Sequence, residues 1–178
     1  MKRMLVPAAL SLATLAVTTL AIATGAFPQG VTQSVMLRAV VPKFCTIGGS
    51  LAPVEFEITL RVSGTGTIST SVPSFTVPSA ICNTPADIIA SSRLGKARAT
   101  GHVRVLSGFT DSADYIATTK FGGAVAMLDT TVERGRTATT QGAVNGVLTI
   151  TVIPVQPAVP LVPATVYTDT LRVRLVPR

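Results

Sequence analysis

Alternation of apolar and polar residues is the main pattern along the chain, and it is clearest near the C-terminus. From Thr170 to Leu175, Leu171 and Val173 fall on one face together with Leu175, while threonine and arginine residues fall on the other. A period of two with β-branched and basic residues outside predicts a strand with one buried face. We therefore expect a final strand whose apolar face packs against strands formed earlier in the chain.

The same alternation predicts several more strands, separated by turns that contain glycine or proline. Helical periodicity is absent after the first 26 residues, so we expect an all-β sandwich built around a single core. The predicted strands cover residues 55–62, 67–72, 74–77, 101–106, 115–119, 124–128 and 147–153, with another short strand after a turn at 83–85. Residues 110–115 are expected to form a turn and 133–146 a long loop or hairpin tip. The prolines at every third position from 154 to 163 predict an extended polyproline II connector.

The first 26 residues differ from the rest of the chain. Lys2 and Arg3 precede an apolar run from Leu5 to Ile22, which ends on small residues. This arrangement is typical of a secretory signal peptide, with cleavage expected after Ala23 or Ala26. A transmembrane anchor is the alternative, because the run is close to the shortest length that spans a bilayer. We favour cleavage and export, and no membrane span in the mature chain.

Composition and charge argue against nucleic-acid binding. Removing Lys2 and Arg3 leaves 13 basic and 8 acidic groups, and the sequence contains no tryptophan. The basic residues are scattered over predicted strand faces instead of forming a patch with stacking aromatic side chains. Solvated strand faces are the simpler interpretation of these charges.

Cys45 and Cys82 are the two cysteines of the chain. In an exported protein an even count of two predicts one disulfide. A bridge closing a loop of this length stabilises the fold by about 4 kcal/mol in the chain-entropy treatment. A redox pair usually has closer spacing, and a metal site needs more ligands than one histidine can complete.

An alternating segment directly follows the expected cleavage site. Its odd positions are mostly apolar, and its even positions are mostly polar or flexible. Pro42 then removes a backbone donor and marks a bend or an edge before Cys45. Such a strand could pack on its own sandwich or on that of a neighbour, and the residues alone leave both alternatives open. The apolar positions are Val31, Val35, Leu37, Ala39 and Val41.

No set of residues predicts catalysis, a metal centre or a cofactor site. Glu55 and Glu57 have a spacing that could suit a glycosidase pair, but nothing suggests that either carboxylate is desolvated. His102 lacks recognisable partners. The carboxylates of Asp111 and Asp114 are too few for a calcium loop. We therefore expect a protein that is not an enzyme and that binds no metal or cofactor.

Three segments together resemble the spore coat protein U domain family, which includes pilin subunits of archaic chaperone–usher systems. They are the alternating stretch 31–47 with its cysteine, the segment 82–95 (CNTPADIIASSRLG), and 166–175 (VYTDTLRVRL). The closing Tyr-Thr-Asp-Thr is the most specific part, whereas residues 96–146 match only in composition. The chain departs from the family pattern at its end, with Val-Pro-Arg where members often have an aromatic residue.

The resemblance implies an immunoglobulin-like, pilin-type sandwich that lacks one strand, so that a groove stays open beside the last strand. A strand from a periplasmic chaperone, and later one from the next subunit, would fill this groove by donor-strand complementation. An outer-membrane usher would be a further partner, and the product would reach the cell surface or the medium. The implied groove-lining residues are Tyr167, Leu171, Val173 and Leu175, and the implied donor is the segment 31–41.

The sequence thus predicts a signal peptide over 1–26, a donor-type strand over 27–43 and a β-sandwich over 44–178. The leading hypothesis is a secreted structural subunit, pilin-like or coat-like, that polymerises with copies of itself or related subunits. The alternative is a self-complemented, monomeric periplasmic binding module whose N-terminal strand completes its own sheet.

Overall fold

A computed structural model of the chain describes residues 38–69, 73–101, 104–105, 107–163 and 166–178. The described residues contain ten strands and no helix, which confirms the all-β prediction. All of the strands belong to the unit Val40–Arg178. They are β1 (Cys45–Ile47), β2 (Val54–Arg61), β3 (Ser74–Cys82), β4 (Ala86–Ser92), β5 (Ala97–Ala99), β6 (Ser112–Phe121), β7 (Ala124–Asp129), β8 (Gly135–Thr139), β9 (Val144–Val155) and β10 (Val166–Pro177).

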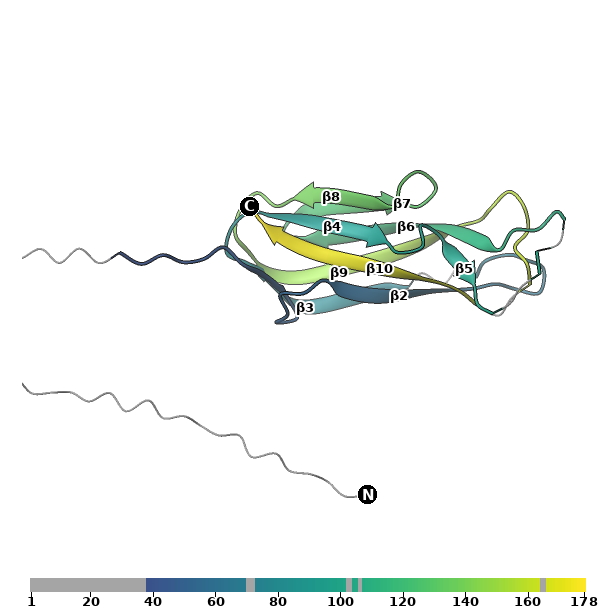
Figure 1. The fold of residues 1–178 in the computed structure, drawn as a ribbon, viewed down its shortest axis with the longest axis horizontal. Coiled ribbons are helices and arrows are strands. Elements are labelled where there is room, and N and C mark those ends of the chain that lie inside the picture. Colours follow the sequence, from purple (N-terminus) through teal and green to yellow (C-terminus); the bar gives the residue numbers. More distant parts are fainter. Residues whose placement is uncertain (1–37, 70–72, 102–103, 106, 164–165) are drawn as a thin grey trace, which may run out of the picture. The chain divides into compact units, whose positions relative to one another are not determined.

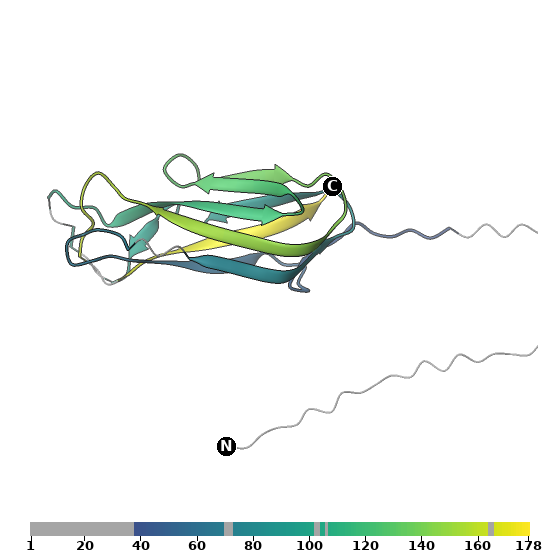
Figure 2. The ribbon, with the colours of Figure 1, turned by 180° about the vertical axis from the view of Figure 1, so that it is seen from behind.

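The strands form two antiparallel layers of a β-sandwich (Figures 1 and 2). One layer has the order β1-β3-β9-β6-β7, and the other has the order β2-β10-β4-β8. The short strand β5 pairs with both β10 and β6, so it joins the layers. The two sheets can therefore share one core instead of needing a covering helix.

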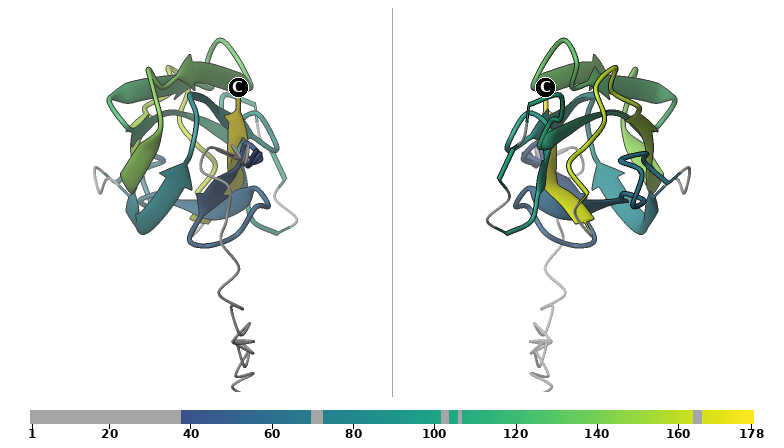
Figure 3. Two further views of the ribbon diagram at one scale, coloured as in Figure 1. Left: turned by 90° about the vertical axis from the view of Figure 1, so that its left-hand side faces the viewer. Right: turned by 90° about the vertical axis from the view of Figure 1, so that its right-hand side faces the viewer.

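The core is built from the inward positions of the alternating strands, which surround it in the end-on views of Figure 3. Burying each large aliphatic side chain of this kind stabilises a fold by about 1.5–3 kcal/mol. Fully buried members come from both layers and include Ile58, Ile88, Leu128, Ile150 and Leu171.

The β6–β7 hairpin shows why two adjacent glycines occur in a chain that is otherwise rich in β-branched residues. Gly122 and Gly123 have φ angles of 55° and 79°, as a two-residue turn with left-handed backbone requires. A Cβ atom on Gly122 would lie 2.5 Å from Cγ2 of Val144. The close approach of Val144 therefore also requires a residue without a side chain at position 122.

Several strand predictions need correction. Residues 133–146, predicted as a long loop or hairpin tip, contain β8 and the start of β9; the sequence of β8, Gly-Arg-Thr-Ala-Thr, lacks the apolar alternation that would have identified it. Arg104 and Val105 are not in a strand, and the rest of the predicted strand lies outside the described residues or in turns and coil. The predicted strand 67–72 is reduced to a bridge between Val62 and Ile68, with 70–72 outside the described residues.

The proline-rich connector is packed more closely than an extended linker would be. Its first proline, Pro154, still belongs to β9, and Leu161 and Val162 are buried. The amide of Leu161 donates to the carbonyl of Gly66, which ties the connector to the loop after β2.

In the part of the chain that the structure describes, no helix is present that could cross a membrane.

Candidate functional site

The last strand, β10, confirms the predicted alternation: its apolar side chains face the core, whereas Arg172 and Arg174 are exposed. The side chains that the resemblance assigns to a groove are all buried, at 0% exposure for the first three and 7% for the fourth: Tyr167, Leu171, Val173 and Leu175.

Both edges of β10 have hydrogen-bonded neighbours. Residues Val166–Val173 pair with β2 on one edge. On the other edge, β4 pairs with Leu171–Pro177, and β5 pairs with Tyr167 and Thr168. The groove predicted beside the last strand is therefore closed in this structure, because β2 lies where the resemblance places a missing strand. The four assigned side chains line the core between the sheets.

The predicted donor strand lies mostly outside the described residues. This applies to Val31, Val35 and Leu37. Ala39 and Val41 are described; both are exposed, Val41 at 73%, and neither belongs to a strand. The alternation of residues 31–41 therefore stays a prediction about a strand that needs a partner.

Strand pairing is incomplete at the edge of β2 that faces away from β10, where β2 meets β3. We call this region the edge seam and define it by the outer edges of β2 and β3 with the side chains Val54, Phe56, Phe75 and Val77. Among the described residues, no strand pairs with β2 on its outer edge or with Ser74–Val77 of β3 on that side. Phe56 and Phe75 make contact across the seam, with ring centroids 5.2 Å apart. All four seam side chains are only partly buried against the core.

The two edges of the seam differ in how easily they could accept another strand. On β3, Pro78 lacks an amide hydrogen, and the register shifts between Val77 and Ala80. Prolines and bulges of this kind block edge pairing. β2 is regular over its eight residues and has neither feature. The outer edge of β2 is therefore the more available of the two.

The N-terminal junction, which we define as Pro42–Phe44 together with Asn83, lies where the chain enters the sandwich. The side-chain oxygen of Asn83 accepts a hydrogen bond from the amide of Phe44 at 2.8 Å. Its side-chain nitrogen donates to the carbonyl of Pro42 at 2.7 Å, and its backbone amide donates to the carbonyl of Phe44 at 3.2 Å. The predicted disulfide between Cys45 and Cys82 is confirmed directly beside this junction.

A buried polar cluster at the centre of the sandwich was not recognised in the sequence. Asp169 of β10 is 2% exposed. Its Oδ2 accepts hydrogen bonds from Ser92 Oγ at 2.5 Å and from Tyr115 Oη at 2.7 Å. Its Oδ1 accepts from the amide of Leu94 at 3.0 Å. Tyr115 comes from β6 and Ser92 from β4, so the carboxylate joins the two layers and is satisfied as a buried charge must be.

The alternation of inward and outward positions in the final strand could have identified this cluster. Asp169 occupies an odd position of the final strand, as do the buried Leu171 and Val173, so alternation alone places its carboxylate inward. The Tyr-Thr-Asp-Thr motif therefore has a structural role here. Its tyrosine, Tyr167, is buried and donates to the carbonyl of Val162 at 2.8 Å, which fixes the entry to β10.

Burial also affects the acid–base behaviour of the tyrosines in the core. Desolvation raises the pKa of Tyr115 well above its usual value, with its neighbour Asp169 adding to the effect. Desolvation likewise raises the pKa of Tyr167. Both groups are therefore neutral hydrogen-bond donors at ordinary pH, and neither is poised for proton transfer.

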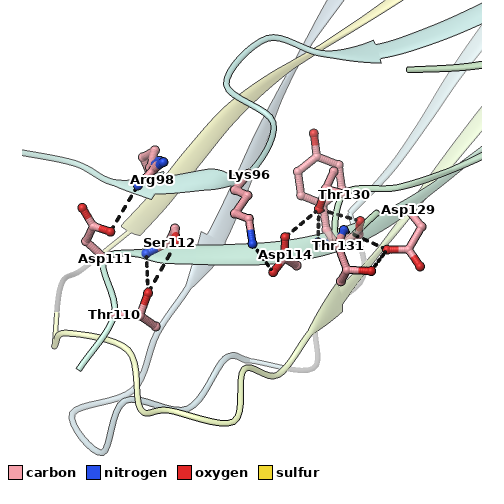
Figure 4. A network of polar contacts seen from close by, with 10 residues as sticks. Lys96, Arg98, Thr110, Asp111, Ser112, Asp114, Asp129, Thr130 and Thr131 are labelled. Atoms are coloured by element: carbon pink, nitrogen blue, oxygen red, sulfur yellow. Dashed lines mark hydrogen bonds and ion pairs between the residues drawn. The ribbon is translucent and has the colours of Figure 1, made fainter. Parts of the chain in front are cut away.

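A second polar cluster lies between the β4–β5 loop and the β7–β8 loop, where a pocket of about 210 Å³ opens. Figure 4 shows two ion pairs in this cluster: Lys96 with Asp114 at 2.9 Å and Arg98 with Asp111 at 3.2 Å. The hydroxyl of Thr130 adds a hydrogen bond to Asp114 and one to the carbonyl of Tyr115. This arrangement fixes the two loops and has no activated nucleophile or base.

The other candidate residues are dispersed. Glu55 forms an ion pair with Arg172 at 2.6 Å, and Glu57 lies on the same exposed face of β2. His102 is outside the described residues. Within the described ranges, no three His, Cys, Asp or Glu side chains come close enough to hold a metal ion. The strand edges, and not a catalytic cluster, are therefore the best candidate site.

No protein family matches the sequence, and no curated protein is similar to it.

Proposed function

We propose that this chain is an exported structural subunit, pilin-like or coat-like, that assembles by donating its N-terminal segment as a strand to another copy. The segment 31–41 is the donor, and the edge seam of the neighbouring sandwich is the acceptor. Periplasmic chaperone and outer-membrane usher proteins are the expected assembly factors, as the resemblance in sequence implies, and the product lies at the cell surface or outside the cell.

The outer edge of β2 is the observation that carries the proposal: among the described residues no strand pairs with it, and its only backbone hydrogen bond there is that from the amide of Ser69 to the carbonyl of Arg61 at its end. An edge strand presents amide and carbonyl groups that can pair with an additional strand. The adjoining side chains Val54, Phe56 and Phe75 are apolar and only partly buried, so covering them is favourable. Pairing with main-chain groups would supply affinity, while the partly buried phenylalanines would select an apolar donor face.

The predicted donor has the pattern that such an edge requires. Its apolar side chains at Val31, Val35, Leu37, Ala39 and Val41 all fall on one face of an extended strand, since they occupy odd positions. That face would cover the seam, and the even positions would remain in solvent. Donation from each copy to the next is heterologous and does not close, so it produces a fibre.

A truncated chain and a peptide test the proposal. The mature chain is expected to polymerise, whereas the chain lacking residues 27–41 is expected to sediment as a folded monomer. A peptide of residues 31–41 should bind this monomer. The same peptide with Leu37→Asp is the matched control and should not bind, because it would place a charge against Phe56 and Phe75. A truncated monomer that never binds the 31–41 peptide would contradict the proposal.

A self-complemented monomer, whose N-terminal strand over residues 31–41 completes its own sheet, is the second candidate function. The outer edge of β2, on which no described strand pairs, belongs to the same chain as this segment and favours the alternative. In that case the mature chain would remain monomeric at all concentrations, and deleting residues 27–41 would destabilise the monomer. Sedimentation of the mature chain over a wide concentration range separates the two candidates.

A further inference from the structure

We propose that the outer face of the layer containing β6, β7 and β9 is an interface at which two copies of this chain pack face to face about a two-fold axis. The inference goes beyond strand donation and does not depend on it, because it concerns a sheet face and not a strand edge. We call this surface the outer patch and define it by five apolar side chains that point away from the core: Ile116, Val125, Met127, Val147 and Ile153.

The outer patch is apolar where an antiparallel sheet is usually polar. Such a sheet commonly has one face in the core and one polar face in solvent. Here Val125, Met127 and Ile153 point outward and are 51%, 56% and 50% exposed. The register places the patch residues side by side, since Ile153 pairs with Ile116 and Met127 pairs with Thr118. Contiguous exposed apolar surface of this kind marks an interaction site.

The outer face of the other layer has the opposite character. The layer that carries the outer patch faces the viewer in Figure 2, and the charged layer lies behind it. The outward side chains of the charged layer include Glu55, Glu57, Arg172 and Arg174, which are all exposed. Stacking the outer patch on this face would remove charges from water, whereas stacking it on a second outer patch covers apolar surface on both sides. Contact between two identical faces is therefore the favourable arrangement.

Two charges at opposite ends of the patch support a second copy as the occupant. Lys120 of β6 is exposed and forms no ion pair among the described residues. Asp129 ends β7, and its Oδ1 accepts hydrogen bonds from the amide and hydroxyl of Thr131. These bonds hold the pKa of Asp129 below its ordinary value, so the carboxylate is charged at neutral pH.

The two charges are too far apart to pair within one chain. Lys120 lies opposite Val125 in the β6–β7 ladder, and Asp129 lies opposite Ile116. Four residues therefore separate them along the strands, which is about 13 Å at the usual rise per residue.

A two-fold axis beside Thr118 and Met127 makes the charges complementary. This residue pair stands midway between Lys120 and Asp129 along the ladder. Rotation about an axis that lies in the interface and crosses the strands brings Lys120 of each copy over Asp129 of the other, so the contact occurs twice. The two apolar patches then cover each other in the manner of sheets packed about 10 Å apart. A second copy thus accounts for both the apolar surface and the two charges.

A cysteine beside the proposed axis tests whether two copies meet at the patch. Both native cysteines are in the disulfide, so Met127→Cys gives the mature chain a single free thiol. A short bismaleimide should link two copies into a covalent dimer and no larger species. Electrophoresis of denatured samples detects covalent dimers only, so polymers formed by strand donation do not contribute. Thr59→Cys is the matched control on the outer face of the other layer, and it should not give this dimer.

Charge reversal tests how the two copies are arranged. In the Met127→Cys chain, Lys120→Glu alone and Asp129→Lys alone should each lower the dimer yield about tenfold, because each places like charges together at both symmetry-related contacts. Mixing the two variants in equal amounts should restore the yield, since every contact in the mixed dimer again joins opposite charges. Restoration on mixing also shows that both variants are folded.

Three results would overturn the proposal. The first is a Met127→Cys chain that cross-links no more than Thr59→Cys, a comparison that needs neither charge variant. The second is a mixture of the charge variants that gives no more dimer than either variant alone. The third is a thiol at position 127 that is protected from a small maleimide without cross-linking, which would mean that another segment covers the patch. Binding of the 31–41 peptide reports on strand donation separately, so failure of one proposal is distinguishable from failure of the other.

Discussion

The centre of β10 and the edge seam between β2 and β3 are both rich in apolar side chains, yet their pairing differs completely. β10 has neighbours on both edges, a buried apolar face, and a carboxylate whose hydrogen bonds reach both layers. The seam has two strand edges without partners among the described residues and four partly buried apolar side chains. The edge without a paired strand is the outer edge of β2, one strand away from β10, beside which the sequence had predicted an open groove.

Replacing a side chain at the closed centre should have the largest effect on stability. Leu171 is fully buried in β10, so Leu171→Ala should lower the free energy of unfolding by about 4 kcal/mol through lost burial and a residual cavity. Denaturant unfolding of the truncated chain measures this value without interference from assembly. A loss below about 1 kcal/mol would show that the centre is not the rigid part of the sandwich.

Removing the buried carboxylate should cost slightly less. Asp169→Ala leaves the hydroxyls of Ser92 and Tyr115 without their acceptor, and we expect a loss of about 3 kcal/mol. Asp169→Asn is the matched control, since its side-chain oxygen can still accept hydrogen bonds, and it should lose less. Equal losses for the two variants would mean that hydrogen bonding at this position contributes little.

At the seam, stability and assembly should respond differently. Phe56→Ala removes a partly buried ring and should lower the free energy of unfolding by only about 1.5 kcal/mol, while abolishing binding of the 31–41 peptide. Thr59→Ala on the exposed face of the same strand should change both quantities little. If Phe56→Ala binds the peptide as tightly as the parent chain, the seam is not the acceptor.

The buried tyrosine predicts a change of stability in alkaline solution. Burial raises the pKa of Tyr115 above its value in the unfolded chain, so its contribution is fully present below about pH 10. Above that pH the unfolded state loses the phenolic proton first, and stability should fall as the pH rises. Thermal unfolding between pH 8 and 11 measures the slope, which should be smaller in Tyr115→Phe. Identical slopes in the two chains would rule out Tyr115 as the cause.

The smallest effect should come from the surface where β2 meets β10. Glu55 and Arg172 form an ion pair with both side chains about half exposed. Arg172→Ala should therefore change the free energy of unfolding by less than about 1 kcal/mol, and less at high salt. A larger loss would indicate that this pair, and not main-chain pairing, holds β2 on β10.

The sequence predicted the elements whose apolar and polar residues alternate regularly. The strands β2, β9 and β10 and the Cys45–Cys82 disulfide all follow from period-two patterns and cysteine count. β8 was missed, because Gly135–Thr139 is held by backbone pairing with β4 and has little apolar character. Alternation identifies which side chains face inward, but it does not identify the neighbouring strand.

The same limit explains why the position of the candidate site could not be predicted from the sequence. The buried face of the final strand was predicted correctly, whereas the neighbour on its open side was not. Nothing local in the sequence shows that β2, more than a hundred residues earlier, pairs with Val166–Val173. The hydrogen bonds of Asn83 to Pro42 and Phe44 likewise join residues about forty positions apart. Long-range pairing of this kind depends on the whole fold.

Amide hydrogen exchange on the truncated chain, with and without the 31–41 peptide, tests strand donation to the seam most directly. The account predicts that the peptide slows exchange along β2, Val54–Arg61, while the amides of β10 remain as protected as before. Two results would contradict it: no change along β2 at saturating peptide, or release of β2 with new protection along β10, which would place the acceptor beside the last strand after all.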